Sequence, residues 1–265
     1  MSFFTYAFTY SAGLLVGLAA CLKIGHLMGR RHRAAAKENG GGALDGVVFA
    51  VLGLLLAFSF SASIDTYTTH RSLLTREAND IGTAFAKIDL LPTEDQAALR
   101  EMLLEYAQTR LAATEAQVGS EEERAALETS RRAEDQIWTR VAKAVKQPGM
   151  ESALLAVVDS FVRLTDATAD QQAEERNHLP KVIYGLVFIL CMMAALVAGF
   201  GLGAIAKIPL IRTVVFSLSV VAIMHVIIDL EYPRSGIFQS SRENVALRET
   251  LADMRALQSL RLSGH

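Results

Sequence analysis

Four long apolar runs alternate along the chain with charged segments. The runs cover residues 3–22, 46–64, 182–206 and 209–228, and the first contains no charged side chain. A bilayer core is crossed by roughly 20 apolar residues of α-helix. Because only a spanning helix bonds its backbone groups internally in lipid, the pattern predicts four transmembrane helices. The first run lacks the basic start and cleavage pattern of a signal peptide, so we expect the mature protein to retain it.

A charged stretch of helix-forming sequence separates the second apolar run from the third. Residues 65–181 hold 21 acidic and 14 basic residues, whereas the remainder of the chain holds 7 acidic and 12 basic ones. This split predicts a water-facing segment carried by a membrane part whose short links are basic. Because alternating strand patterns are absent, the predicted fold class is all-α: four transmembrane helices with a helical extramembrane bundle inserted between spans two and three.

Turn and cap signals divide this insert into helices. Between Ile64 and Pro92 only Gly82 interrupts the helical pattern, which predicts one long helix that leaves the membrane and continues into water. The segments 93–96 (TEDQ) and 120–123 (SEEE) both fit the capping box, in which a hydroxyl and a carboxyl or amide group satisfy the first backbone amides of a helix. Each segment therefore predicts the start of a helix.

The C-terminal tail carries apolar residues at helical spacing: Leu247, Leu251, Met254, Leu257 and Leu260. Such a helix can dock on the insert, lie on the membrane, or bundle with copies of itself, and we favour docking or bundling. The expected organisation of the chain therefore has four parts. These are the first two spans with their basic link (1–64), the soluble helical insert (65–181), the transmembrane hairpin (182–232) and the amphipathic tail helix (233–265).

Two of the predicted spans carry small residues at spacings of three and four. The first stripe comprises Gly46, Ala50, Gly53, Ala57 and Ser61, and the second comprises Ala195, Gly199 and Gly203. Small side chains let helices approach closely in lipid. The stripes are explained either by packing within one chain or by packing between subunits of a homo-oligomer around a central axis.

Basic residues are concentrated in the two short links. The link between the first two spans carries Lys23, Arg30, Arg31, Arg33 and Lys37, and the tight turn between the last two adds Lys207. Short loops rich in Lys and Arg mark the cytoplasmic side, whereas long loops are translocated largely regardless of charge. We therefore expect a multi-pass protein of the cell's inner (plasma) membrane, with both termini and the insert outside the cytoplasm.

No arrangement typical of catalysis or metal binding occurs in the sequence. The six histidines form no ligand pair, and there is no nucleophile elbow or glycine-rich phosphate loop. Cys21 and Cys191 lie inside apolar runs without a nearby second cysteine, so they behave as small apolar side chains. We therefore expect no enzyme, metal site or cofactor. The net charge of −2 provides no basic surface for nucleic acid.

A first polar cluster follows the second span and contains Arg76, Glu77, Asn79, Asp80 and Gly82. It is either a solvated helix face or a polar network at a helix junction near the membrane surface. Glycine weakens a helix by about 1 kcal/mol relative to alanine. Its presence here therefore predicts close packing against a neighbouring segment.

A second polar cluster ends the fourth span, where Asp229 precedes Arg234. A carboxylate at the edge of a span needs a partner. We favour an ion pair that locks the fourth span to the base of the second, formed with Arg234, Arg71 or Arg76. A site for a permeating ion is the alternative.

Two histidines lie in or beside the last two spans. His178 lies just before the third span, at the same membrane surface as the second cluster, and His225 lies inside the fourth. A histidine within a span faces protein or a water path. We expect His225 to form a hydrogen bond with Ser59, Ser61 or Ser63 of the second span.

The order of these motifs resembles that of the bacterial bestrophin-like domain membrane proteins, a family of unknown function. The resemblance covers about residues 40–240. It is carried by 56–60 (LAFSF), 77–85 (EANDIGTAF), 89–92 (DLLP) and 227–236 (IIDLEYPRSG).

True bestrophins are pentameric anion channels with four spans and a large helical region between the second and third. The resemblance therefore implies an oligomeric channel for small anions whose second span lies nearest the axis, with Phe58 and Phe60 as a candidate pore constriction. Bestrophins keep their helical region in the cytoplasm, opposite to the side that the basic links predict. The alternative function is a non-conducting membrane scaffold or envelope sensor whose helical insert binds a partner.

Overall fold

The computed structural model describes residues 3–32, 43–149, 151–174, 181–204, 210–232, 234 and 244–263. These residues form eight α-helices and two short 3-10 helices and include no β-strand, which confirms the all-α fold class. The chain divides into two compact units, each built from segments far apart in the sequence. The first unit contains Met1–Tyr67 and His178–Phe238, and the second contains Thr68–Asn177 and Gln239–His265.

The first unit holds four helices that are long and apolar enough to cross a membrane. They are α1 (Phe3–Arg31), the N-terminal part of α3 (Ala43–Lys87), α7 (Lys181–Gly201) and α8 (Leu210–Glu231). The short 3-10 helix η2 (Leu202–Ala204) extends α7. The four candidate spans predicted from hydropathy are therefore present.

Helix α3 belongs to both units, because it runs without a break for 45 residues. At 1.5 Å per residue this corresponds to about 68 Å, more than twice the roughly 30 Å of a bilayer core. The helix ends at Lys87 and is followed by the 3-10 turn η1 (Ile88–Leu90), immediately before Pro92. The prediction of one long helix beyond the second span is confirmed.

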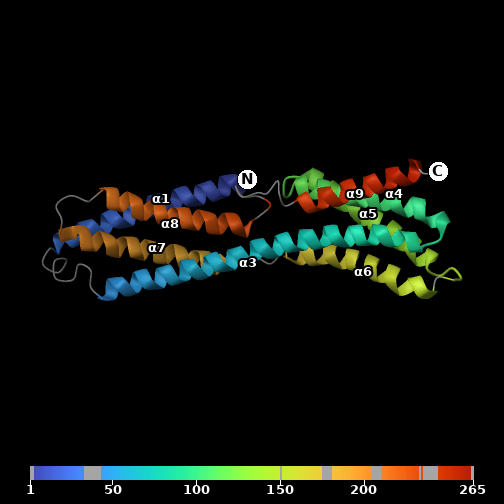
Figure 1. Cartoon of the computed structure of the whole chain (residues 1–265). Helices are drawn as coiled ribbons and strands as arrows, with labels where there is room; N and C mark the ends of the chain where they lie inside the picture. The colour runs from blue at the N-terminus through green and yellow to red at the C-terminus, as the bar shows by residue number, and fades with distance from the viewer. Residues whose placement is uncertain are drawn as a thin grey trace. The chain divides into compact units, whose positions relative to one another are not determined.

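Glycines bring α1 and α7 together, and the two helices lie side by side in Figure 1. A Cβ atom placed on Gly25 of α1 would lie 2.1 Å from the carbonyl oxygen of Leu196. One placed on Gly199 of α7 would lie 2.2 Å from the carbonyl oxygen of Leu22. The small-residue stripe of the third span therefore packs within the chain.

The stripe on α3 behaves differently. Cβ atoms placed on Gly46 and Gly53 would meet no described atom within 4 Å. All five members of this stripe are exposed, whereas the opposite side of the same span buries Leu52, Leu56, Ser59 and Ser63. The small-residue face of α3 is therefore largely uncovered by the described part of its own chain, except that Gly53 and Ala57 line a groove beside α8.

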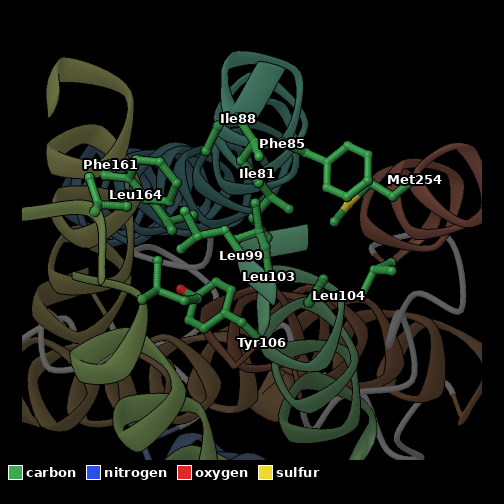
Figure 2. Close-up of a cluster of buried hydrophobic side chains, with 14 of the residues drawn as sticks. Ile81, Phe85, Ile88, Leu99, Leu103, Leu104, Tyr106, Phe161, Leu164 and Met254 are labelled. Atoms are coloured by element: carbon green, nitrogen blue, oxygen red, sulfur yellow. The ribbon is translucent and has the colours of Figure 1, made fainter. Parts of the chain in front are cut away.

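The second unit is a helical bundle with its own apolar core. It combines the C-terminal part of α3 with α4 (Thr93–Glu115), α5 (Glu121–Ala144), α6 (Glu151–Glu174) and α9 (Val245–Ser263). Figure 2 shows buried side chains meeting from several of these helices, including Phe85 of α3, Leu103 of α4, Phe161 of α6 and Met254 of α9.

The tail helix α9 packs against α4 within this unit. Leu247, Leu251 and Met254 are buried, whereas Leu257 and Leu260 of the same predicted stripe are exposed. Arg248 adds an ion pair to Glu115 of α4, with its Nε 2.8 Å from Oε1. Of the three alternatives for the tail, docking on the helices of residues 68–177 is therefore observed.

The two predicted capping boxes have different outcomes. At the second, the Ser120 hydroxyl accepts from the Glu123 amide at 3.1 Å, and the Glu123 carboxylate accepts from the Gly119 amide at 2.5 Å. At the first, Pro92 occupies the N-cap and supplies no side-chain hydrogen bond. Gln96 instead donates to the carbonyl oxygen of Leu91 at 2.8 Å. The helix begins at Thr93, but the predicted cap is wrong.

Candidate functional site

The uncovered part of α3 carries a line of large apolar side chains beside the small-residue face. The line consists of exposed residues spaced by three and four: Val47, Val51, Leu54 and Phe58. Phe58 is 63% exposed, the most of the four. One face of this transmembrane helix carries small residues and a neighbouring face carries large apolar ones, and both are exposed in the part of the chain that the structure describes.

The two phenylalanines of the candidate constriction occupy different faces of α3. Residues two apart on an α-helix differ by about 200° around its axis. Phe60 is 38% exposed and lines a groove between α3 and α8. The other lining residues are Gly53, Leu56 and Ala57 of α3 and Ala222, Ile223 and Val226 of α8. Phe58 lies away from this groove. The structure therefore does not bring the pair together as one constriction.

Two carboxylates are buried where α8 ends. Asp229 is 2% exposed and Glu231 is fully buried. The hydroxyl of Ser63, also fully buried, donates to Glu231 Oε2 at 3.5 Å and so connects α8 to α3 within the first unit. The sequence places Glu231 in the same polar cluster, but a role was predicted only for Asp229 and Arg234.

Arg76 forms ion pairs within the second unit. Its guanidinium lies 3.8 Å from Asp80 and 3.3 Å from Asp170 of α6, both in the second unit. Arg71 is exposed, and Arg234 is half-buried. The ion pair of Asp229 with Arg234, Arg71 or Arg76 that would lock the fourth span stays a prediction.

Glu77 is the buried centre of a polar network in the second unit. Arg110 of α4 donates to both carboxylate oxygens of Glu77, with Nη2 3.2 Å from Oε2. Gln171 of α6 donates to Oε2 of Glu77 at 2.5 Å and also accepts from Arg110. For Glu77 the network interpretation is therefore the observed one, whereas Asn79 of the same cluster is exposed.

Gly82, one turn further along α3, faces the tail helix. A Cβ atom placed on it would lie 3.4 Å from Cγ2 of Thr250. The glycine therefore packs against a neighbouring segment, as its helix cost predicts.

Sequence reasoning did not identify Arg110 or Gln171, although the spacing of Arg110 from buried Tyr106 and Ala113 places it on the apolar face of α4.

Tyr106 extends the buried polar region beside this network. Its hydroxyl and the Thr168 hydroxyl lie 2.9 Å apart. Burial raises the pKa of Tyr106 well above its usual range, and the charge of Glu77 acts in the same direction. The phenol is therefore neutral at physiological pH.

Partial burial also raises the pKa of Glu134, against the effect of a hydrogen bond with Thr165.

His225 has a partner on α1 instead of α3. Its Nδ1 lies 3.0 Å from the Ser11 hydroxyl oxygen. The predicted bond to Ser59, Ser61 or Ser63 is therefore wrong, because α8 presents this side to α1. His178 lies outside the described residues.

In the part of the chain that the structure describes, no three His, Cys, Asp or Glu side chains converge on a point that would hold a metal ion. The buried carboxylates are instead used in contacts between helices, as at Ser63–Glu231 and Arg110–Glu77.

Comparisons with known proteins assign the whole arrangement to one family and fold. The family model described as "Bestrophin-like domain" matches residues 13–245. No curated protein sequence matches the chain significantly.

The fold matches crystal structures of a bacterial Bestrophin homolog from Klebsiella pneumoniae. One variant of that homolog has a TM-score of 0.69 at 12% identity, covering 91% of this chain and 98% of that one. Another structure of the homolog has a TM-score of 0.68 at 13% identity, covering 90% and 97%. A crystal structure described as that of a membrane protein has a TM-score of 0.69 at 12% identity, covering 91% and 98%.

Proposed function

The chain belongs to the Bestrophin-like domain family, and on this basis we propose that it is an oligomeric membrane channel for small anions, with α3 nearest the axis of the ring. The proposal places it as a multi-pass protein of the inner (plasma) membrane, surrounded by lipid and assembled from copies of itself. It assigns no catalytic activity to the chain.

The uncovered small-residue face of α3 is the observation that carries this proposal. In lipid, helices associate through close packing of small residues, because the lipid tails are as apolar as the side chains. The stripe on α7 packs against α1 in this way, with Gly199 close to the carbonyl oxygen of Leu22. The stripe on α3 is equally suited to close packing but is exposed, and Cβ atoms placed on its two glycines would meet no described atom within 4 Å, although Gly53 and Ala57 line the groove beside α8. A second copy of α3 supplies the missing surface.

In such a ring the neighbouring face of α3 faces the axis. That face carries Val47, Val51, Leu54 and Phe58. A narrow apolar passage gates ion flow by losing water. We therefore assign the constriction to this line, with Phe58 its largest member, and place Phe60 in the groove between α3 and α8. The preference for anions rests on the family, since true bestrophins conduct anions.

The mass of the purified protein in detergent, followed by flux, tests the proposal. We expect an oligomer, and chloride-loaded liposomes containing it should release chloride faster than empty ones. A monomer would contradict the ring, because four spans with so few polar residues do not line a pore alone. An intact oligomer without flux would favour the second candidate, a scaffold or envelope sensor. Exposed apolar residues on the second unit, among them Trp138 and Leu155, offer a partner surface for that role.

The side of the membrane that the second unit faces stays a prediction. The basic links favour the outside, whereas the layout of true bestrophins favours the cytoplasm. A pair of reporter fusions at the C-terminus, one active only inside the cytoplasm and one only outside it, decides between them.

A further inference from the structure

A cavity of about 500 Å³ lies in the first unit, at the end where α3 and α8 begin. Its walls come from the end of α1, the start of α3, the end of α7 and the start of α8, so it lies where the candidate spans reach one surface of the bilayer. The volume is within the range of cavities that bind small molecules. It is sufficient for a headgroup and the first part of an acyl chain.

Most of the cavity wall is apolar. Phe49 of α3 and Phe216 of α8 meet edge to face there, with ring centroids 6.2 Å apart and an interplanar angle of 89°. Leu22, Val197 and Leu202 line other parts of the wall. A ligand that fits this surface needs an apolar body.

Three polar side chains interrupt the apolar wall. Arg212 and Thr213 come from the first turn of α8, and Asp45 comes from the first turn of α3. Arg212 is exposed, whereas Asp45 is half-buried. The Thr213 hydroxyl oxygen is buried and has no hydrogen-bond partner among the described residues. An unsatisfied buried hydroxyl is unfavourable, so a ligand oxygen or amine at this position would stabilise the protein.

The opposite charges of Arg212 and Asp45 define the headgroup. A guanidinium binds phosphate with paired hydrogen bonds. A carboxylate has several acceptor sites and can accept from an ammonium group in addition to its contacts within the protein. A headgroup that carries both phosphate and a primary ammonium matches both side chains. An anionic headgroup without an amine would place a second negative charge near the Asp45 carboxylate, and a quaternary ammonium has no hydrogen to donate.

We propose that this cavity binds the headgroup of an ethanolamine-type phospholipid, with the phosphate at Arg212, the ammonium at Asp45 and Thr213 bonded to a lipid oxygen. The inference requires the membrane insertion on which the proposed function rests, but it does not require ion conduction.

Binding is tested on the full-length protein, delipidated in detergent and analysed by native mass spectrometry and thermal unfolding. The added lipids are phosphatidylethanolamine, phosphatidylglycerol and phosphatidylcholine with identical acyl chains. We expect phosphatidylethanolamine to bind about tenfold more tightly than either of the others and to raise the unfolding temperature most. Equal retention of all three lipids, or equal stabilisation by inorganic phosphate, would overturn the proposal.

Charge variants identify the site. Arg212→Gln should lower the affinity for phosphatidylethanolamine about tenfold, and Asp45→Asn should remove its preference over the other two lipids. Arg30→Gln is the matched control, because Arg30 is an exposed arginine of α1 at the same end of the unit that does not line the cavity. Equal losses in the Arg212 and Arg30 variants would show only general attraction to lipid headgroups and would overturn the site.

A steric variant keeps the test valid if a charge variant fails to fold. Ala198→Leu adds volume to the cavity wall from α7 without changing any charge. It should displace phosphatidylethanolamine while the protein keeps its helical circular dichroism spectrum and oligomer mass. Unchanged binding would contradict the proposal. Alkaline extraction of cell membranes that contain the full-length protein tests membrane insertion separately. A failure of lipid binding is therefore not confused with a failure of the proposed function.

Discussion

Arg110 donates to Glu77 through both Nε and Nη2 in a site where the two side chains are 5% and 0% exposed. A buried carboxylate is tolerated only where its charge is paired and its oxygens are hydrogen-bonded. The side-chain amide of Gln171 completes the set. This contact ties α3, α4 and α6 together in the second unit.

Removing the arginine should destabilise the second unit strongly. Arg110→Met leaves the Glu77 charge buried and unpaired, for which the expected loss is about 3–5 kcal/mol. Unfolding of the full-length protein in detergent, followed by circular dichroism, measures it. The control is Arg124→Met, since Arg124 pairs with Glu121 at 3.7 Å where both side chains are exposed. The control should change stability by less than about 1 kcal/mol. Similar losses in both variants would show that the buried pair has no special role.

The glycine contact between α1 and α7 gives a second prediction. Gly25→Ala should destabilise the first unit, because the new Cβ would lie 2.1 Å from a backbone oxygen of α7 that cannot rotate away. Gly13→Ala, in the same helix, meets nothing within 4 Å and should be neutral or stabilising by up to about 1 kcal/mol. Thermal unfolding in detergent distinguishes the two, and equal melting temperatures would argue against the close approach of α1 and α7.

The end of α9 should loosen at acidic pH. Arg261 donates to both carboxylate oxygens of Asp89 at 2.5 Å. The hydrogen bond with Arg261, and then that with Arg100, lowers the pKa of Asp89 below its ordinary value of 3.8. Because the folded-state pKa is the lower one, the contact contributes fully above pH 3.8 and is lost as the pH falls through the folded value. Both side chains are more than a third exposed, so the contribution is small.

Hydrogen exchange of α9, compared between pH 6 and pH 3, measures this effect. The wild-type helix should exchange faster at pH 3 after correction for the intrinsic rate. In Asp89→Asn the acceleration should already be present at pH 6 and change little between the two values. A variant that keeps the full wild-type pH response would assign the effect to other carboxylates.

The assignment of the constriction to one phenylalanine gives a fourth prediction. Phe58→Ala should raise chloride leak from liposomes, because it widens the apolar line on the uncovered side of α3. Phe60→Ala removes apolar surface from the groove that Phe60 lines with Ala222 and Val226 of α8, and it should lower stability with little change in leak. Flux and melting temperature measured on both variants separate these roles. Greater leak from the Phe60 variant would reverse the assignment.

Hydropathy and the positions of helix-breaking residues were sufficient to predict the architecture. Apolar runs long enough to cross a bilayer and strong helix breakers both act through the local sequence. They predict the four candidate spans, the continuous α3 and the Ser120 cap. The cap at residues 93–96 fails because Pro92 takes the N-cap position in place of Thr93, and Gln96 donates to the carbonyl oxygen of Leu91 at 2.8 Å.

Partner choice could not be read from the sequence. Periodicity shows that His225 and the small-residue stripes lie on particular helix faces, but it does not identify the helix that each face meets. His225 meets Ser11, and Gly199 meets Leu22, both on α1. The spacing of four between Gly25 and Gly29 matches that of Gly199 and Gly203 and could have indicated this contact. No comparable signal identifies Arg110 as the partner of Glu77.

Cysteine cross-linking at the uncovered face of α3 tests the central claim most directly. In a background with Cys21 and Cys191 replaced by alanine, Ala57→Cys should give covalent dimers and higher oligomers in native membranes. Val215→Cys, on α8 and 58% exposed, is the control for random collision and should give few. If Ala57→Cys stays monomeric, or cross-links no faster than Val215→Cys, then α3 does not face its own copies and the channel proposal is contradicted.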